Sequence, residues 1–133
     1  MANPDNLSVV HQAYANFNAG DVPALLAQMD PSIVWMVPDV ANSRAGGRRD
    51  GHAQVQEFFT VLGTDQEAVR FEPRQFVAQA DTVVALGDYE WRVRATGRSF
   101  TSDFAHVFTV RDGKISRFQE FMDSGAAVEA YRK

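Results

Sequence analysis

The second half of the chain alternates between apolar and polar residues, and this alternation constrains the fold more than any other feature of the sequence. It runs through residues 69–79, 82–95, 100–111 and 114–121, with short connections between the runs. Alternation with a period of two predicts strands that bury one face. The last connection is Asp112-Gly113, which is among the strongest sequence signals for a hairpin. The sequence therefore predicts four strands joined as an antiparallel meander.

Helical periodicity dominates the first half of the chain. The first helix has apolar residues at helical spacing, and we expect it to end at Gly20. A second, short helix is expected over residues 22–29, and a third begins after the capping residue Asp50. Between them, residues 33–37 are predicted to form a buried strand and residues 38–50 a loop. Helices followed by a meander indicate an α+β domain with helices on one face of a curved sheet.

Length and composition limit the possible functions. The 133 residues correspond to a single domain over residues 1–133. The chain has no cysteine, which excludes a disulfide framework and a thiol nucleophile. Its net charge of −4 offers no basic surface for nucleic acid. Because no apolar run is long enough to span a membrane and the N-terminus lacks a signal-peptide pattern, we expect a cytoplasmic protein with no nucleic-acid or membrane partner.

Aromatic residues are numerous for so small a domain, with ten Phe, three Tyr and two Trp. We expect some of these rings to line a cavity or an interface, and strand pairing indicates which face of the sheet carries them. If Ala95 pairs with Phe100 across the turn, one face of the sheet becomes largely aromatic. The expected cross-strand pairs are Tyr89 with His106, Trp91 with Phe104, and Arg92 with Asp103.

The final hairpin extends this aromatic face. Pairing Arg111 with Lys114 places His106 opposite Gln119 and brings Asp123 onto the same face as His106. On a flat sheet these two polar groups would be about 13 Å apart along the strand. The inner surface is therefore predicted to be apolar, with one imidazole and, near its rim, one carboxylate.

The opposite face of the sheet is predicted to be only partly polar. Ala105, Val107, Phe118 and Met122 lie among charged residues on that face. Helices cover one face of the sheet, so the other needs a second cover. We therefore expect a symmetric homodimer through the outer face of the sheet.

Several motifs, spread through most of the chain, resemble the nuclear-transport-factor-2-like superfamily in its SnoaL-like, ketosteroid-isomerase-like branch. The matching motifs are Tyr14-x-x-Phe17-x-x-Gly20-Asp21, Ile33-x-Trp35 with Pro38, Gly51-x-x-x-Val55-x-x-Phe58-Phe59, Ala105-His106-Val107-Phe108, Arg111-Asp112-Gly113-Lys114-Ile115, and Phe118-x-x-Phe121-x-Asp123. The resemblance implies a cone-shaped α+β barrel, in which a curved antiparallel sheet wraps around N-terminal helices and encloses a hydrophobic cavity. It also implies a bacterial protein that forms dimers.

The resemblance suggests catalytic roles for three residues. Asp123 is similar to the general base of limonene-epoxide hydrolases, and Tyr14 to the tyrosine that donates to the oxyanion in ketosteroid isomerases. His106 corresponds to the protonated aspartate donor of the isomerases, a published example of a tuned pKa. Two features depart from these relatives. The hydrolases carry an Arg-x-Asp pair on a middle strand, and Glu90-x-Arg92 reverses its charges. The carboxylate that serves as the base of the isomerases is replaced here by Val37.

The remaining expectations concern ligands. The predicted substrate-binding residues are Trp35, Phe59, Tyr89, Trp91, Phe104, Phe108 and Phe121. His11 and His52 have no partner at zinc-ligand spacing, so we expect neither a metal nor another cofactor.

Two functions are compatible with these residues. One is cofactor-free acid–base catalysis (isomerisation, cyclisation or hydration) on a hydrophobic, polyketide-like or steroid-like carbonyl compound. The alternative is a protein that binds a hydrophobic metabolite or lipid without transforming it. A third possible function, an adaptor that binds a partner protein, would require an exposed apolar patch in addition to the dimer interface.

Overall fold

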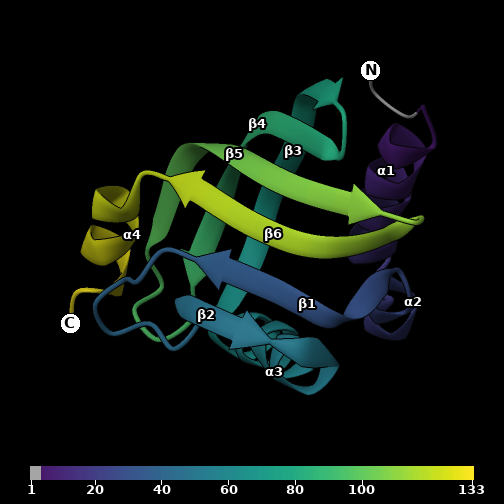
Figure 1. Cartoon of the computed structure of the whole chain (residues 1–133). Coiled ribbons are helices and arrows are strands. Elements are labelled where there is room, and N and C mark those ends of the chain that lie inside the picture. The colour runs from purple at the N-terminus through teal and green to yellow at the C-terminus, as the bar shows by residue number, and fades with distance from the viewer. Residues whose placement is uncertain (1–3) are drawn as a thin grey trace.

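The structure, a computed structural model, describes residues 4–133 and confirms the expected α+β fold. The helices are α1 (Pro4–Asn18), α2 (Val22–Ala27), α3 (Gly51–Asp65) and α4 (Ser124–Tyr131). The strands are β1 (Met29–Val37), β2 (Gly47–Asp50), β3 (Gln66–Gln79), β4 (Thr82–Val93), β5 (Ser99–Arg111) and β6 (Lys114–Met122). In Figure 1 the strands form one curved sheet, with α1 and α4 near opposite ends of the strands and α3 beside β2.

The predicted meander is present, but the sheet is mixed rather than wholly antiparallel. The strand order is β2-β1-β6-β5-β4-β3. Strands β3 to β6 pair antiparallel, whereas β1 pairs parallel with β6. The β1–β6 pairing joins strands that are far apart in sequence, so no turn motif in the sequence could predict it. The end of the expected loop 38–50 forms β2, which pairs with β1.

The register of β4 on β5 differs from the prediction by four residues. Tyr89 lies opposite Ser102 and Trp91 opposite Phe100, because the chain turns earlier than expected, with the Val93 N–H donating to the carbonyl of Arg98. The predicted pairs of Tyr89 with His106, Trp91 with Phe104 and Arg92 with Asp103 are therefore wrong. An even shift leaves every side chain on its predicted face. The aromatic inner face thus survives the error in register.

The register of β5 on β6 differs by one residue, and this error changes faces. The hairpin begins as predicted, with Arg111 opposite Lys114, but Thr109 then pairs with Arg117 and leaves Ser116 as an extra residue. Beyond this bulge, His106 lies opposite Glu120 rather than Gln119. The residues of β6 past the bulge therefore face the sides opposite to those predicted. The placement of Phe118 and Met122 on the outer face is wrong, because both face the inside of the curved sheet.

Glycine or aspartate lies at the ends of several helices. Gly20 follows α1 with a positive φ of 71°, a conformation that favours glycine. Asp21 caps α2 as expected by accepting from the Ala24 N–H at 3.1 Å. Asp50 precedes α3 but forms no side-chain cap, and its carboxylate instead pairs with Arg48. Helix α4 was not predicted. It begins at Ser124, with Asp123 as its cap.

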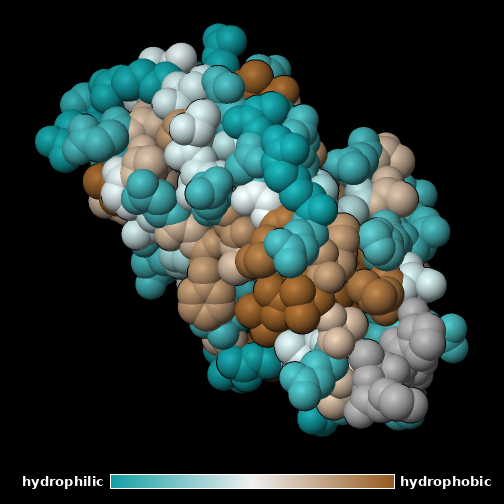
Figure 2. Space-filling model, turned by 90° about the horizontal axis from the view of Figure 1, so that it is seen from above, coloured by the Kyte–Doolittle hydropathy of each residue, from teal (hydrophilic) through white to brown (hydrophobic). Residues whose placement is uncertain are grey.

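Apolar side chains gather on the outer face of the sheet. Two cross-strand rows carry them, one through Val77, Val84 and Val107, and one through Leu86, Ala105 and Phe121. Val77, Leu86 and Phe121 are exposed. Figure 2 shows a hydrophobic patch surrounded by hydrophilic surface over the central strands. We call these six residues the outer patch.

Candidate functional site

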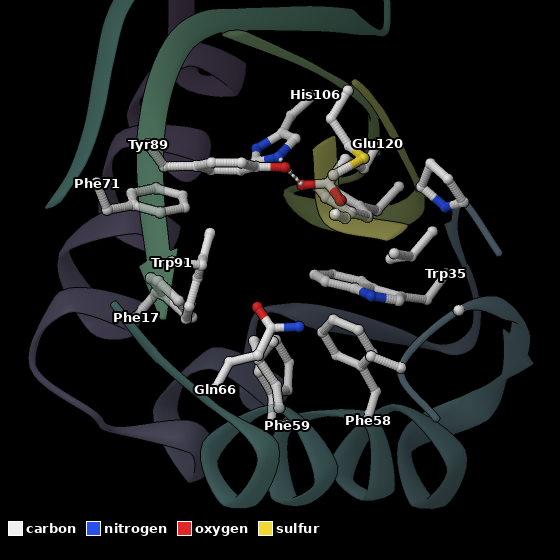
Figure 3. Close-up of a pocket in the computed structure, with 18 of the residues that line it drawn as sticks. Phe17, Trp35, Phe58, Phe59, Gln66, Phe71, Tyr89, Trp91, His106 and Glu120 are labelled. Atoms are coloured by element: carbon white, nitrogen blue, oxygen red, sulfur yellow. Dashed lines mark hydrogen bonds and ion pairs between the residues drawn. The ribbon is translucent and has the colours of Figure 1, made fainter. Parts of the chain in front are cut away.

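A pocket opens inside the curve of the sheet, closed by α1, α3, α4 and the loop after β1. Its cavity volume is about 110 Å³, which is room for a small molecule rather than a single water. Its walls are largely aromatic, and Figure 3 shows these rings around the central space. Many of the aromatic residues that are numerous in the sequence therefore line this pocket.

Most of the predicted wall residues lie where they were expected. The lining includes Trp35, Phe59, Tyr89, Trp91 and Phe108. Phe104 is buried beside the lining, with its ring stacked 4.1 Å from that of His106. Phe121 is 51% exposed on the outer face, because the bulge at Ser116 turns it away from the pocket. Substrate contact by the lining residues stays a prediction.

His106 connects two polar side chains in this wall. Its Nδ1 atom lies 2.7 Å from the hydroxyl of Tyr14, and its Nε2 atom lies 2.8 Å from Glu120 Oε2. A carboxylate can only accept, so Nε2–H donates to Glu120, and Nδ1 of the neutral ring then accepts from Tyr14. We assign this tautomer from the partners of the ring. Tyr89 donates to the same Oε2 atom at 3.3 Å, as the dashed line in Figure 3 shows.

Burial holds this network in place. The His106 side chain is 5% exposed and that of Glu120 is 14% exposed, and both line the pocket. Burial and, to a smaller extent, the charge of Glu120 raise the pKa of Tyr14 and that of Tyr89. Both hydroxyls therefore keep their protons at neutral pH and remain hydrogen-bond donors. The result is a carboxylate held among proton donors inside an apolar cavity.

Asp123 does not join this network, so the expectation that it shares the inner face with His106 is wrong. It is exposed and accepts from the Ala126 N–H at 3.1 Å as the cap of α4. The carboxylate in the wall is that of Glu120, which the predicted register placed on the outer face. The one-residue bulge decides whether Glu120 or Asp123 faces the inside of the sheet, and no local sequence motif predicts this bulge.

A second polar pair lines the pocket. Gln66, at the start of β3, donates from Nε2 to the hydroxyl of Tyr131 at 2.5 Å. Both residues are buried, and both belong to the lining. Sequence reasoning missed this pair because α4, which carries Tyr131, was not predicted.

Other classes of site find no support in the described part of the chain. Among residues 4–133, no group of three or more His, Asp or Glu side chains is placed to hold a metal ion. No helix within these residues is long and apolar enough to cross a membrane.

Comparison with known proteins places this fold and pocket in a family. The sequence pattern of the SnoaL-like domain matches residues 10–118, so the chain belongs to the family of SnoaL-like domains. A crystal structure of an NTF2-like (nuclear-transport-factor-2-like) protein from Burkholderia xenovorans LB400 is 30% identical, with a TM-score of 0.90 over 99% of both chains. TerC, crystallised with polyporic acid, is 31% identical, with a TM-score of 0.84 over 97% of this chain and 99% of TerC.

One curated relative is a much longer protein. A histidinol-phosphate aminotransferase from Gluconacetobacter diazotrophicus is 28% identical over 100 residues, which make up 73% of this chain. The chain spans only 27% of the length of that relative. The match therefore concerns one part of the longer protein.

Proposed function

We propose that this protein catalyses cofactor-free proton transfer on a small, hydrophobic carbonyl compound, with Glu120 as the base. The observation that carries the proposal is a buried carboxylate in an aromatic pocket, hydrogen-bonded to both His106 and Tyr89. A carboxylate held at a substrate-sized cavity can act as a general base wherever a substrate proton comes within hydrogen-bond reach. The catalytic role first expected of Asp123 passes to Glu120 in this proposal.

The chemistry follows from the donors around the carboxylate. Oε2 of Glu120 holds the hydrogen bonds from His106 and Tyr89, so we assign proton transfer to Oε1. Glu120 accepts a proton from the carbon next to the carbonyl. The C–H electron pair forms a C=C bond to the carbonyl carbon, and the C=O π pair moves to the oxygen to give an enolate. The O–H of Tyr89, whose bond to Glu120 is 3.3 Å long, can turn to donate to that oxygen. Return of the proton to another carbon isomerises the compound, whereas attack of the enolate on a second carbonyl closes a ring.

His106 and Tyr14 position the base in this scheme. The Nε2–H of His106 fixes Oε2 of Glu120, and the hydroxyl of Tyr14 holds the imidazole in that tautomer. The ring of His106 also stacks on Phe104, which restricts its rotation. We therefore assign His106 to orient Glu120 rather than to take the first proton.

The test uses 2-acetylnaphthalene, a flat aromatic ketone with exchangeable acetyl protons. The protein is incubated with this ketone in deuterated buffer, and loss of the acetyl proton signal is followed by NMR. We expect exchange well above the rate in buffer alone. The aromatic walls of the pocket favour a flat aromatic probe, and TerC, a 31% identical relative, was crystallised with a small molecule, polyporic acid.

A second candidate function is binding without catalysis, and one observation favours it. Val37, at the position of the isomerase base, lines the pocket with an apolar side chain. The same experiment separates the two functions, because binding also quenches the fluorescence of Trp35 or Trp91. Quenching without deuterium exchange would support a binding protein and contradict the catalytic proposal.

We also propose that the outer patch forms a homodimer interface, which keeps the expected dimer on the outer face of the sheet. The patch is exposed, apolar and spread over four neighbouring strands, which favours association with a second copy. Sedimentation equilibrium is expected to give twice the monomer mass, and Phe121→Glu to shift it toward the monomer. A monomeric wild-type protein at micromolar concentration would contradict this expectation.

A further inference from the structure

We infer that Gln66 and Tyr131 form a second polar anchor, which selects ligands that carry a hydroxyl at the end remote from the carbonyl. This inference names the substrate class of the same pocket and rests on the proposed function. We call these two residues the far anchor.

The far anchor lies apart from the carboxylate in the pocket. Figure 3 shows the Gln66 side chain entering the cavity from one side, with Tyr89, His106 and Glu120 gathered on the opposite side and aromatic rings between them. A ligand that spans the cavity would therefore contact an apolar wall along its length and a polar group at each end. Such a ligand is flat and apolar along its length and carries a polar group at each end.

The hydrogen bonds of the far anchor leave capacity for a ligand. Gln66 is only 8% exposed, yet within residues 4–133 its Oε1 atom accepts no hydrogen bond. The Tyr131 oxygen accepts from Gln66, so its own O–H hydrogen points elsewhere. Gln66 lines the pocket, so a ligand there that supplies a donor to Oε1 adds a hydrogen bond in a largely buried site.

The missing partner is a group that both donates and accepts. A hydroxyl donates to Gln66 Oε1 and accepts from the O–H of Tyr131. The same hydroxyl serves if the amide is rotated by 180°, because it can then accept from the amide nitrogen. Hydroxylated aromatic ketones therefore fit both ends of the pocket.

The test compares two probes that differ by one hydroxyl, 6-acetyl-2-naphthol and 2-acetylnaphthalene. Wild-type protein is expected to bind the naphthol about tenfold tighter or more, measured by tryptophan fluorescence, because one or two hydrogen bonds in a buried site give a preference of this size. Gln66→Leu and Tyr131→Phe are each expected to bring the two affinities to within about threefold of each other. The matched control, Gln75→Leu, changes an exposed glutamine on the same strand and should keep the wild-type preference.

Several outcomes would overturn the far anchor. These are equal affinities for the two probes in wild-type protein, a preference that survives in both variants, or failure of the wild-type protein to bind either probe. Thermal melting of each variant checks that it is folded, and Tyr131→Phe keeps the aromatic ring if Gln66→Leu does not fold. Deuterium exchange measured in the same samples separates the two proposals. If the protein prefers the naphthol but does not exchange the acetyl protons of the ketone, the far anchor is supported and the catalytic proposal is contradicted. If the protons exchange but the two probes bind equally well, only the far anchor is contradicted.

Discussion

Replacing Glu120 with glutamine is expected to slow deuterium exchange into 2-acetylnaphthalene by about 10²–10⁴-fold, the usual contribution of a positioned general base. Glutamine has nearly the same shape as glutamate, and its amide oxygen can still accept from His106 and Tyr89. The amide oxygen is, however, far too weak a base to take a proton from carbon. The pocket should therefore still bind the ketone while the proton transfer is lost.

Two matched variants make this result specific. Glu57→Gln removes the same charge from an exposed position on α3 and should leave exchange unchanged. Asp123→Asn removes the carboxylate that the sequence first suggested as the base, and asparagine keeps the cap of α4 because it is an equally good cap residue. Full exchange by the Glu120→Gln protein, or loss of exchange in the Asp123→Asn protein alone, would contradict the assignment of Glu120 as the base.

Changing Gly87 to alanine is expected to lower the free energy of unfolding by about 3 kcal/mol or more. Gly87 lies in β4 between Pro73 of β3 and Phe104 of β5. A Cβ atom there would lie 2.2 Å from the carbonyl oxygen of Glu72 and 2.8 Å from both the Pro73 Cα and the Phe104 Cζ. Two of these atoms belong to the backbone, so the strands themselves would have to move apart.

The matched control for this stability prediction is Gly63→Ala. Gly63 lies in α3, and apart from its chain neighbours and the adjacent backbone of the helix, no heavy atom lies within 4 Å of the position that a Cβ would take. Alanine there should raise stability by up to about 1 kcal/mol, because glycine is the poorer helix former. Urea unfolding of the two variants and the wild-type protein provides the measurement. Equal unfolding midpoints for Gly87→Ala and wild type would show that β3 and β4 can separate without cost.

Much of the fold could be predicted because its signals are local. Asp112-Gly113 correctly indicated the last hairpin, and alternation correctly placed Tyr89 and His106 on the same face. The register of β4 on β5 was off by an even number of residues, so the inner face stayed correct. Helix α4 escaped prediction because it is short and rich in small residues, without a clear apolar stripe.

The candidate site shows where such reasoning stops. The sequence alone determined that His106 faces an aromatic interior, because the side-chain direction in a strand follows from a period of two. Only the tertiary structure decided that Glu120, and not Asp123, shares that interior. The difference is the single extra residue at Ser116, and a bulge forms where the packing of both strands as a whole favours it. Tyr14, His106, Glu120 and Tyr131 come from distant parts of the chain, and they meet because α1 and α4 pack against the curved sheet, which no local pattern encodes.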